Sequence, residues 1–288
     1  MPMIPPAATA PSLEYFRTLV AEDDHFILLE AAAAVGQDEQ PDLDAMAVVA
    51  RIEELGTTLG RRLAADAAAQ QRLRMLNHYF FKELGFAGNV NDYYSFRNSH
   101  LHAVLETRRG IPITLALIYM EMAHQIGLKV AGISFPGHFL VKCSLAQGEV
   151  IIDPMVGRSL SREDLDERLL PYRQALGLVG DFEIPLGLFL QPATPRETLA
   201  RLLRNLKGIY RERNSPERLL EVLNRMIIVA PDSTSDLRDR GLVYRQLECW
   251  RPALQDLADY LAREPGAPDA DDIRASVVDL TRRCARLN

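Results

Sequence analysis

The chain has 288 residues, of which 48% are hydrophobic and 25% charged, and its formal net charge is −6. This length allows one large domain or two smaller ones. The acidic balance gives no indication of the basic surface of a nucleic-acid binder, and we expect no direct nucleic-acid binding. Three cysteines lie far apart with no C-x-x-C pair, which excludes a zinc ribbon or disulfide framework and is typical of a reducing compartment. The N-terminal residues show no signal-peptide pattern, and the longest apolar run is about half a membrane span. We therefore expect a cytoplasmic protein without membrane association.

The N-terminal part of the sequence has a helical pattern. Residues 1–10 are rich in Pro and Ala, and we expect them to form a flexible tail. Over residues 11–85, apolar residues recur at spacings of three and four, and alanine-rich stretches favour helix. Pro41 and Gly60 divide this N-terminal helical region into separate helices.

The middle segment, residues 86–190, changes character. Asn98 and Ser99 are suited to cap a helix over about residues 100–108, with Gly110 as its left-handed stop. A second helix, over about residues 112–126, starts with a proline and is apolar on nearly all sides, so it should be buried. The β-branched runs that follow predict a short antiparallel sheet: LKVAGIS, HFLVKCS and EVIID. A buried helix plus this sheet, with helices on both sides, is an α+β fold.

The last segment, residues 191–288, is helical and carries an internal repeat. Four pairs of residues recur at a period of 34: Tyr210 and Tyr244, Leu219 and Ala253, Leu223 and Leu257, Pro231 and Pro265. This is the period of the tetratricopeptide repeat, in which each unit is a pair of helices. The second copy has the usual small residue at Gly241, whereas the first has Lys207 there. Two pairs are fewer than the three that usually stand alone, so we expect them to lean on the middle segment. The alternative is a generic helical bundle.

Residues with catalytic potential flank the predicted buried helix. A cysteine acyl-transfer site needs a thiolate at a helix N-terminus, a histidine that activates it and an acid that orients the histidine. His138 opens one predicted strand and Asp153 ends the next, so adjacent antiparallel strands can bring the two side chains together. The buried helix, however, starts at Pro112, so the nucleophile is the missing member.

No cysteine of the chain fills this gap. Cys143 lies five residues after His138, an odd offset that points its side chain to the opposite face of a strand. Cys249 and Cys284 lie in the repeat segment. Thr114, in the first turn of the buried helix, is the nearest hydroxyl and is a candidate nucleophile. A threonine at such a position more often bonds its own helix backbone.

One long run of the sequence resembles a known family. The run GFAGNVNDYYSFRNSHLHAVLETRRGIPITLALIYMEMA, with FPGHFLVK and IIDP further on, is similar to the SirB-type transglutaminase-like proteins of bacteria. The resemblance is strong over about residues 76–157 and fair over the whole chain. It implies a transglutaminase-like (papain-like) core followed by tetratricopeptide repeats. It carries no demonstrated enzymatic activity, and the bacterial branch is linked to regulation of gene expression.

The resemblance also assigns positions in this sequence. The related enzymes carry Gly-x-Cys at the start of the core helix, then a histidine in a strand and an aspartate after it. Here Gly110-Ile111-Pro112 takes the place of Gly-x-Cys, a form that the SirB-type branch generally shows. Pro112 therefore replaces the cysteine, while His138 and Asp153 match the other two members.

Polar residues before the buried helix form a candidate binding surface: Asn91, Tyr93, Tyr94, Arg97, Asn98, Arg108 and Arg109. Tyrosines and arginines beside a helix N-terminus can hold an acidic group. Turn and cap residues together with a solvated ion pair to Glu106 explain the same residues. A His138–Asp153 pair can likewise be kept for stability alone. His100 and His102, even with this pair added, match no metal-ligand spacing of a known type, and we expect no metal or cofactor.

We therefore interpret the chain as a transglutaminase-like protein that lacks the nucleophilic cysteine. Its predicted role is that of a non-catalytic, protein-binding or regulatory factor. The cleft lined by His138, Asp153, Tyr93, Tyr94 and Arg97 would hold a peptide segment or an acidic ligand, and the repeats would supply a second surface. The alternative is a hydrolase or amidase in which His138 and Asp153 activate water or Thr114.

Overall fold

The computed structural model describes residues 11–21, 26–177 and 184–286 of the chain. The expected flexible tail, residues 1–10, lies outside the described residues. The chain divides into two compact units: residues 24–202, which we call the core unit, and residues 1–23 with 203–288, which we call the repeat unit. Among the described residues, no helix combines the length and apolarity that a membrane crossing requires.

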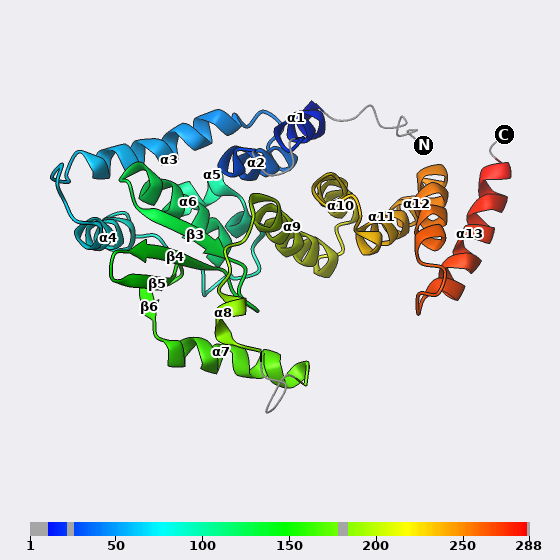
Figure 1. Cartoon of the computed structure of the whole chain (residues 1–288). Coiled ribbons are helices and arrows are strands. Elements are labelled where there is room, and N and C mark those ends of the chain that lie inside the picture. Colours follow the sequence, from blue (N-terminus) through cyan, green and yellow to red (C-terminus); the bar gives the residue numbers. More distant parts are fainter. Residues whose placement is uncertain (1–10, 22–25, 178–183, 287–288) are drawn as a thin grey trace. The chain divides into compact units, whose positions relative to one another are not determined.

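The core unit is a mixture of helices and short strands (Figure 1). Its helices before the sheet are α2 (Leu28–Ala34), η1 (Val35–Asp38), α3 (Ala45–Gly60), α4 (Ala69–Asn77), η2 (His78–Glu83), η3 (Phe96–Ser99), α5 (Leu101–Thr107) and α6 (Pro112–Gln125). Its strands are β1 (Ala87–Gly88), β2 (Arg109–Gly110), β3 (Lys129–Ile133), β4 (Leu140–Leu145), β5 (Gly148–Asp153) and β6 (Arg158–Leu160). Helices α7 (Arg162–Ala175) and α8 (Leu186–Phe189) follow the sheet.

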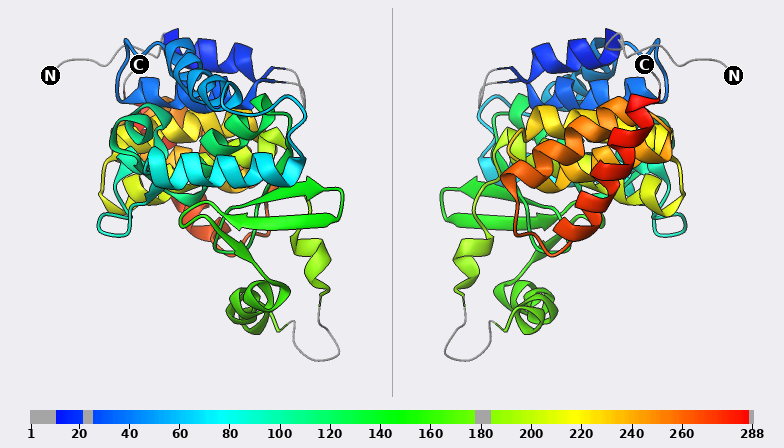
Figure 2. Two further views of the ribbon diagram at one scale, coloured as in Figure 1. Left: turned by 90° about the vertical axis from the view of Figure 1, so that its left-hand side faces the viewer. Right: turned by 90° about the vertical axis from the view of Figure 1, so that its right-hand side faces the viewer.

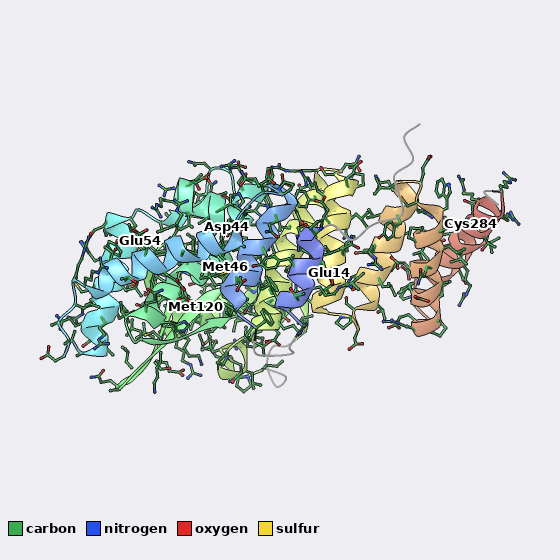
Figure 3. All side chains as sticks on the ribbon, turned by 90° about the horizontal axis from the view of Figure 1, so that it is seen from above. Glu14, Asp44, Met46, Glu54, Met120 and Cys284 are labelled. Carbon is green, nitrogen blue, oxygen red and sulfur yellow. The ribbon has the colours of Figure 1, made fainter. Side chains whose placement is uncertain are left out.

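Helix α6 is buried, as its sequence predicts, with eleven of its fourteen residues inside. Helix α3 packs along it and buries Ile52 and Leu59 completely. The start of α3 is fixed by Asp44, whose Oδ1 accepts a hydrogen bond of 3.0 Å from the backbone N–H of Ala47. Figure 3 shows Asp44 at this end of α3 and Glu54 further along the helix. The apolar centre of the core unit is therefore a helix enclosed by helices and by the sheet.

The four-stranded sheet is antiparallel in the order β3-β4-β5-β6. The three predicted strands are confirmed, and β6 is an additional short strand. The strand register places Val130 opposite Cys143 and Val141 opposite Ile152. On the other face, Ile133, Leu140, Ile151 and Leu160 share one core cluster with Leu165 and Leu169 of α7 and with Leu186 of α8. Figure 2 shows α7 lying to one side of the strands, so α6 and α7 contribute to opposite faces of the sheet.

The end of α5 differs from the prediction that Gly110 is its left-handed stop. Arg108 takes that conformation instead, with a φ of 58°. Gly110 lies in β2, which pairs in parallel with β1, and a Cβ atom there would lie 2.8 Å from Thr114 Oγ1. Glycine is needed at residue 110 for this close approach, so the turn falls two residues earlier. The predicted cap is also wrong, because Asn98 and Ser99 lie in η3 and His100 precedes α5 without a side-chain cap.

Helix α9 (Pro195–Glu212) begins in the core unit and continues into the repeat unit. The repeat unit also contains α1 (Pro11–Leu19), α10 (Pro216–Val229), α11 (Thr234–Gln246), α12 (Trp250–Arg263) and α13 (Ala270–Ala285).

The period of 34 residues is visible in the backbone. Asn214 and Glu248 both have a positive φ, 50° and 58°, at the turn inside each helix pair. One residue later, the N–H of Ser215 donates to Tyr210 O at 3.0 Å, and the N–H of Cys249 donates to Tyr244 O at 2.8 Å. Lys207, where a small residue is usual, forms ion pairs of 2.5 Å with Asp236 and 2.6 Å with Asp239. The two predicted helix pairs are therefore present, and α13 packs on the second through Ile273 and Leu280.

Candidate functional site

The structure brings His138 and Asp153 together at one end of the sheet. Asp153 is the last residue of β5, as predicted, whereas His138 lies two residues before β4 rather than opening it. The turn before His138 has Pro136 and then Gly137 with a φ of 69°, and the N–H of His138 donates to Phe135 O at 3.0 Å, as in a type II turn. The Nε2 atom of His138 lies 2.9 Å from Asp153 Oδ1. With the proton on Nε2, the lone pair of Nδ1 is the basic site of the ring.

A third residue, Arg168 of α7, completes this arrangement. Its Nη2 atom donates to the second carboxylate oxygen of Asp153 at 2.8 Å, and the N–H of Met155 donates to Oδ1 at 3.0 Å. Sequence reasoning missed Arg168, because its contact is created by the packing of α7 on the sheet and no motif marks it. We call His138, Asp153 and Arg168 the His–Asp–Arg cluster.

The charge of Asp153 is strongly stabilised although the side chain is only 4% exposed. Burial by itself raises the pKa of this carboxyl, but the hydrogen bond and charge of His138, the N–H of Met155 and the bond from Arg168 together lower it to about 2. Asp153 is therefore ionised over the whole physiological range. Its carboxylate connects the end of β5 with the turn before β4, through His138, and with helix α7, through Arg168.

This pKa has a consequence for stability at acidic pH. Because the folded state lowers the pKa of Asp153 from 3.8 to about 2, its contribution of about 2 kcal/mol is present above pH ~4 and is lost as the pH falls toward ~2. We expect Asp153→Asn to remove that part of the pH dependence. The measurement is urea unfolding followed by circular dichroism at a series of pH values. If the free energy of unfolding fell by the same amount between pH 4 and pH 2 in the wild type and in Asp153→Asn, the lowered pKa of Asp153 would be contradicted.

The start of α6 holds Pro112 in the first turn and Thr114 beside it. Thr114 is completely buried. Its Oγ1 donates to the carbonyl oxygen of Asn98 at 2.7 Å and accepts from the N–H of Ile111 at 3.2 Å. The hydroxyl is thus used to fix the start of the helix, in line with the structural alternative for a threonine at this position.

A short hydrogen-bonded path connects the start of α6 with the His–Asp–Arg cluster. The N–H of Asn89 donates to Gly110 O at 3.1 Å, and the N–H of Gly88 donates to Met155 O at 3.0 Å. Met155 in turn donates to Asp153. Strand β1 therefore lies between the Gly110–Pro112 segment and the turn that carries Asp153, and it fixes the position of one against the other.

Asn98, in η3, is a buried residue that holds the loop between β1 and η3. Its Nδ2 donates to Asp92 O at 2.6 Å and to Tyr93 O at 3.1 Å, and its Oδ1 accepts from Asn89 Nδ2 at 2.9 Å. Asn91, in that loop, is exposed. Asn98 therefore fixes the backbone of the loop at Asp92 and Tyr93.

Tyr93 and Tyr94 are on the surface, 39% and 66% exposed. Their ring centroids are 5.5 Å apart in an edge-to-face arrangement. Partial burial and Tyr94 raise the pKa of Tyr93, against an opposing effect of Arg201. Arg201, in the second turn of α9, also donates to Ser134 Oγ at 3.1 Å. These contacts place Arg201, which the sequence did not mark, between Tyr93 and the turn that leads to His138.

The three arginines of the predicted binding surface each contact a different partner. Arg97 pairs with Glu106 at 3.4 Å, and both side chains are exposed, which is the ion pair that the alternative interpretation expected. Arg108 stacks its guanidinium over Phe86 at 4.6 Å, and Arg109 donates to Gly85 O at 2.6 Å. Arg108 and Arg109 therefore hold the segment before β1.

The remaining candidates are also placed. His100 and His102 stack on each other with ring centroids 5.7 Å apart. Within the described residues, no group of three or more His, Cys, Asp or Glu side chains is arranged to hold a metal ion. Cys143 is completely buried, and burial raises the pKa of its thiol, so it is a poor nucleophile. Cys249 and Cys284 are partly buried in the repeat unit.

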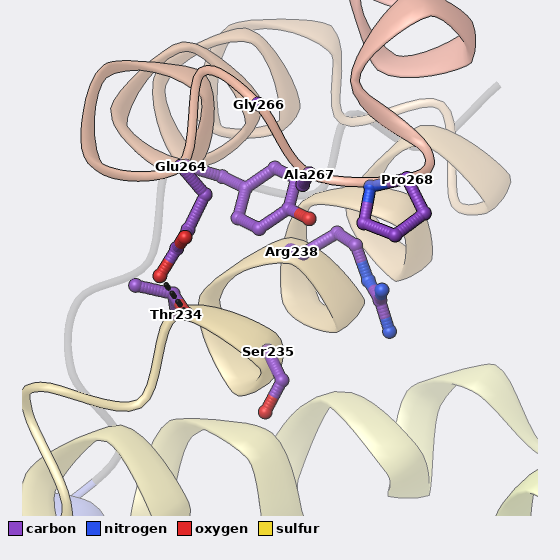
Figure 4. Close-up of a pocket in the computed structure, with 8 residues that line it drawn as sticks. Thr234, Ser235, Arg238, Glu264, Gly266, Ala267 and Pro268 are labelled. Atoms are coloured by element: carbon purple, nitrogen blue, oxygen red, sulfur yellow. Dashed lines mark hydrogen bonds between the residues drawn. The ribbon is translucent and has the colours of Figure 1, made fainter.

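The repeat unit has a hollow of about 470 Å³ at the start of α11 and the end of α12. It is lined by Thr234, Ser235, Arg238, Tyr260, Glu264, Gly266, Ala267 and Pro268 (Figure 4). The Oγ1 atom of Thr234 donates to Glu264 Oε1 at 3.2 Å, and Arg238 is paired with Asp239 and with Asp269. Thr234, Glu264 and Arg238 of this hollow therefore already have polar partners, either within its lining or just outside it.

Comparison with known proteins places the chain in a family. Residues 46–204 match the model of the transglutaminase-like superfamily, and residues 206–277 match that of the tetratricopeptide repeat. A UPF0162 protein of Xylella fastidiosa is 36% identical over 271 residues, 93% of this chain and 95% of that protein. The chain belongs to the UPF0162 family of transglutaminase-like proteins.

Other relatives are less similar to this chain. A UPF0162 protein of Pseudomonas aeruginosa is 31% identical, with 80% of this chain and 82% of that protein covered. Protein SirB1 of Salmonella typhimurium is 28% identical, with 82% and 86% covered. The predicted SirB-type resemblance is therefore confirmed. A crystal structure of menin aligns with a TM-score of 0.36 and 13% identity over 86% of this chain and 68% of that one, which is too low to support a shared fold.

Proposed function

We propose that this UPF0162 protein is a non-catalytic binding protein that recognises peptide segments of a protein partner. The observation that carries the proposal is the start of α6. The family resemblance assigns Pro112 to the position of the cysteine of the related enzymes, and the nearest hydroxyl, that of Thr114, is buried and bonded to Asn98 and Ile111. An acyl-transfer site needs an accessible nucleophile next to its base, and neither residue provides one.

The His–Asp–Arg cluster supports the same proposal. In a catalytic triad the aspartate accepts a hydrogen bond from the histidine ring and stabilises the imidazolium that forms during the reaction. Here Asp153 also carries an ion pair of 2.8 Å with Arg168, so its charge is already balanced and it stabilises an imidazolium less. The cluster is better suited to hold three elements in place than to drive proton transfer.

The exposed apolar side chains near this cluster form the binding surface that we propose. Val90 and Val156 are 78% and 65% exposed, and they flank the hydrogen bond between Gly88 and Met155. Tyr93 and Tyr94 lie three and four residues after Val90 in the same loop. We propose that these residues act together, and we call them the aromatic rim: Val90, Tyr93, Tyr94 and Val156. Tyrosines are enriched among the residues that dominate protein interfaces, and an extended peptide with apolar side chains fits such a rim.

The repeat unit supplies the second surface of the proposal. Helical repeats present extended faces that take up peptides of partner proteins, and residues 206–277 match the tetratricopeptide model. A partner held by both surfaces gains affinity from the linkage, because the second contact becomes intramolecular.

Selection from a displayed peptide library tests the first surface. We expect peptides that bind the wild-type protein with micromolar affinity and bind Tyr94→Ala at least tenfold more weakly, because a central aromatic contact is worth about 1.5–3 kcal/mol. Leu188→Ala is the matched control, because Leu188 is also highly exposed, at 63%, but lies on α8. An equal loss of peptide affinity in both variants, or no loss in Tyr94→Ala, would exclude the aromatic rim as the peptide-binding surface.

A second candidate function is a hydrolase or amidase that uses the dyad to activate water. It is favoured by the 2.9 Å bond between His138 and Asp153. It requires that purified protein turns over amide or ester substrates and that His138→Ala abolishes this turnover. We expect wild-type protein and His138→Ala to be equally inactive against a panel of such substrates. Turnover that disappears in His138→Ala would establish the enzyme and exclude the non-catalytic role.

A further inference from the structure

Helix α1 belongs to the repeat unit although more than 180 residues separate it from the helix that it packs against, α10. Phe16 is its buried residue, 0% exposed, and Val20, one residue past the helix, is 3% exposed. Ser12, Leu13 and Leu19 are partly buried on the same side. Glu14 and Arg17 are exposed and pair with each other. At nine residues, α1 is too short to be a stable helix alone in water. Its helical form therefore depends on docking to α10.

An unusual arginine of α10 forms the centre of this contact. Arg225 is 0% exposed, and its guanidinium lies over the ring of Phe16 at 4.7 Å. Its Nη1 atom also reaches the carbonyl oxygen of Ser12 at 3.5 Å. A cation over an aromatic face is attracted most when both are removed from water. The contact is thus specific for an aromatic residue at the position of Phe16.

Helix α10 has two buried stripes, and only one of them belongs to the repeat pattern. Leu219, Leu223 and Met226 form the first, whose members Leu219 and Leu223 recur in α12 as Ala253 and Leu257. Val222, Arg225 and Val229 form the second, about a quarter-turn away. We call this second stripe the Arg225 stripe.

The second repeat has no counterpart of the Arg225 stripe. The positions 34 residues later in α12 hold Asp256, Asp259 and Arg263. Asp256 is bonded to Arg240, while Asp259 and Arg263 are exposed to solvent. The second repeat thus forms without apolar residues at these positions. The Arg225 stripe is therefore not part of the repeated pattern, and α1 packs on α10 through Arg225.

We propose that the Arg225 stripe is a helix-docking surface, that α1 occupies it in cis, and that a partner protein docks there by displacing α1. The partner element is an amphipathic helix that presents an aromatic side chain to Arg225 and apolar side chains three or four positions before and after it. This inference deepens the proposed binding role of the repeat unit. It does not depend on the aromatic rim of the core unit.

The test uses the full chain and a fluorescein-labelled peptide of residues 11–21 as the probe, with binding followed by fluorescence anisotropy. Phe16→Ala in the chain should release α1 and open the stripe. We expect the peptide to bind Phe16→Ala at least tenfold more tightly than the wild-type chain, in which α1 competes. Arg17→Ala, at an exposed neighbouring position, should behave like the wild type. Adding Arg225→Met to Phe16→Ala should weaken peptide binding at least tenfold.

Equal affinity of the peptide for the wild type and Phe16→Ala, or no binding to Phe16→Ala, would overturn the proposal. If Phe16→Ala proves unfolded, hydrogen exchange on the wild-type chain tests whether α1 can be displaced. A displaceable α1 should exchange its amides at least tenfold faster than α10. Equal protection would show that α1 is a fixed part of the repeat unit and would also overturn the proposal. Neither outcome affects the test of the aromatic rim, which measures binding of different peptides to Tyr94→Ala.

Discussion

Alanine at Asp153 is expected to lower the free energy of unfolding by about 3 kcal/mol. The substitution leaves the guanidinium of Arg168 and the ring of His138 without their common partner, and it removes the acceptor for the N–H of Met155. The estimate is at the lower end for a broken buried ion pair, because the Arg168 side chain is 34% exposed and water can partly replace the lost contact. The measurement is urea unfolding followed by circular dichroism.

Glu149→Ala is the matched control for Asp153→Ala. Glu149 lies on the same strand and pairs with Lys142 at 3.4 Å, but its side chain is 56% exposed. An exposed pair of this kind contributes less than about 1 kcal/mol. If the two variants lost the same stability, Asp153 would not be the buried connection between α7 and the sheet that the structure indicates.

The second large effect is expected at Asp256 in the repeat unit. Asp256 accepts two hydrogen bonds, of 2.7 and 2.8 Å, from Arg240, and Arg240 also donates to Asn224 Oδ1 at 3.1 Å. These contacts join α10, α11 and α12. We expect Asp256→Ala to cost about 2–3 kcal/mol, because a two-pronged, mostly buried pair loses its acceptor.

Fluorescence of Trp250, the only tryptophan of the chain, follows unfolding of the repeat unit. Asp271→Ala is the control, because Asp271 forms an exposed ion pair with Arg274 on α13, in which the two side chains are 96% and 51% exposed. We expect its unfolding midpoint to match that of the wild type. A midpoint for Asp256→Ala that also matches the wild type would exclude Arg240 and Asp256 as the connection between the helix pairs.

The strongest periodic signals of the sequence correctly predicted the main elements. The all-round apolar run after Pro112 became α6, and the β-branched runs became β3 to β5. The period of 34 predicted two equivalent helix pairs, and the turns inside them occur at Asn214 and Glu248. The predicted pairing of neighbouring strands also placed His138 and Asp153 within hydrogen-bond distance of each other. Each of these features depends on local pattern or on the pairing of neighbouring strands, which a sequence displays directly.

The features that could not be predicted depend on contacts between distant segments. Arg168 lies in a polar helix, and only the packing of α7 on the sheet brings it to Asp153. The parallel pair β1–β2 is two residues long, too short to show a period. Gly110 was assigned to a helix stop because glycine is common there, whereas its real constraint is the closeness of Thr114. The contact between Phe16 and Arg225 joins residues 209 positions apart in the chain.

The most direct measurement concerns a cysteine placed at residue 112. In a chain with Cys249 and Cys284 changed to serine, we would measure the rate of alkylation of Pro112→Cys by iodoacetamide as a function of pH. If this position keeps the place of an attacking sulfur, the start of α6 and the imidazole of His138 should lower the thiol pKa to about 7.5 or below. Adding His138→Ala should raise it again. An ordinary thiol pKa of about 8.5 that does not change with His138→Ala would contradict the view that this chain is a thiol-enzyme scaffold with proline in place of the nucleophile.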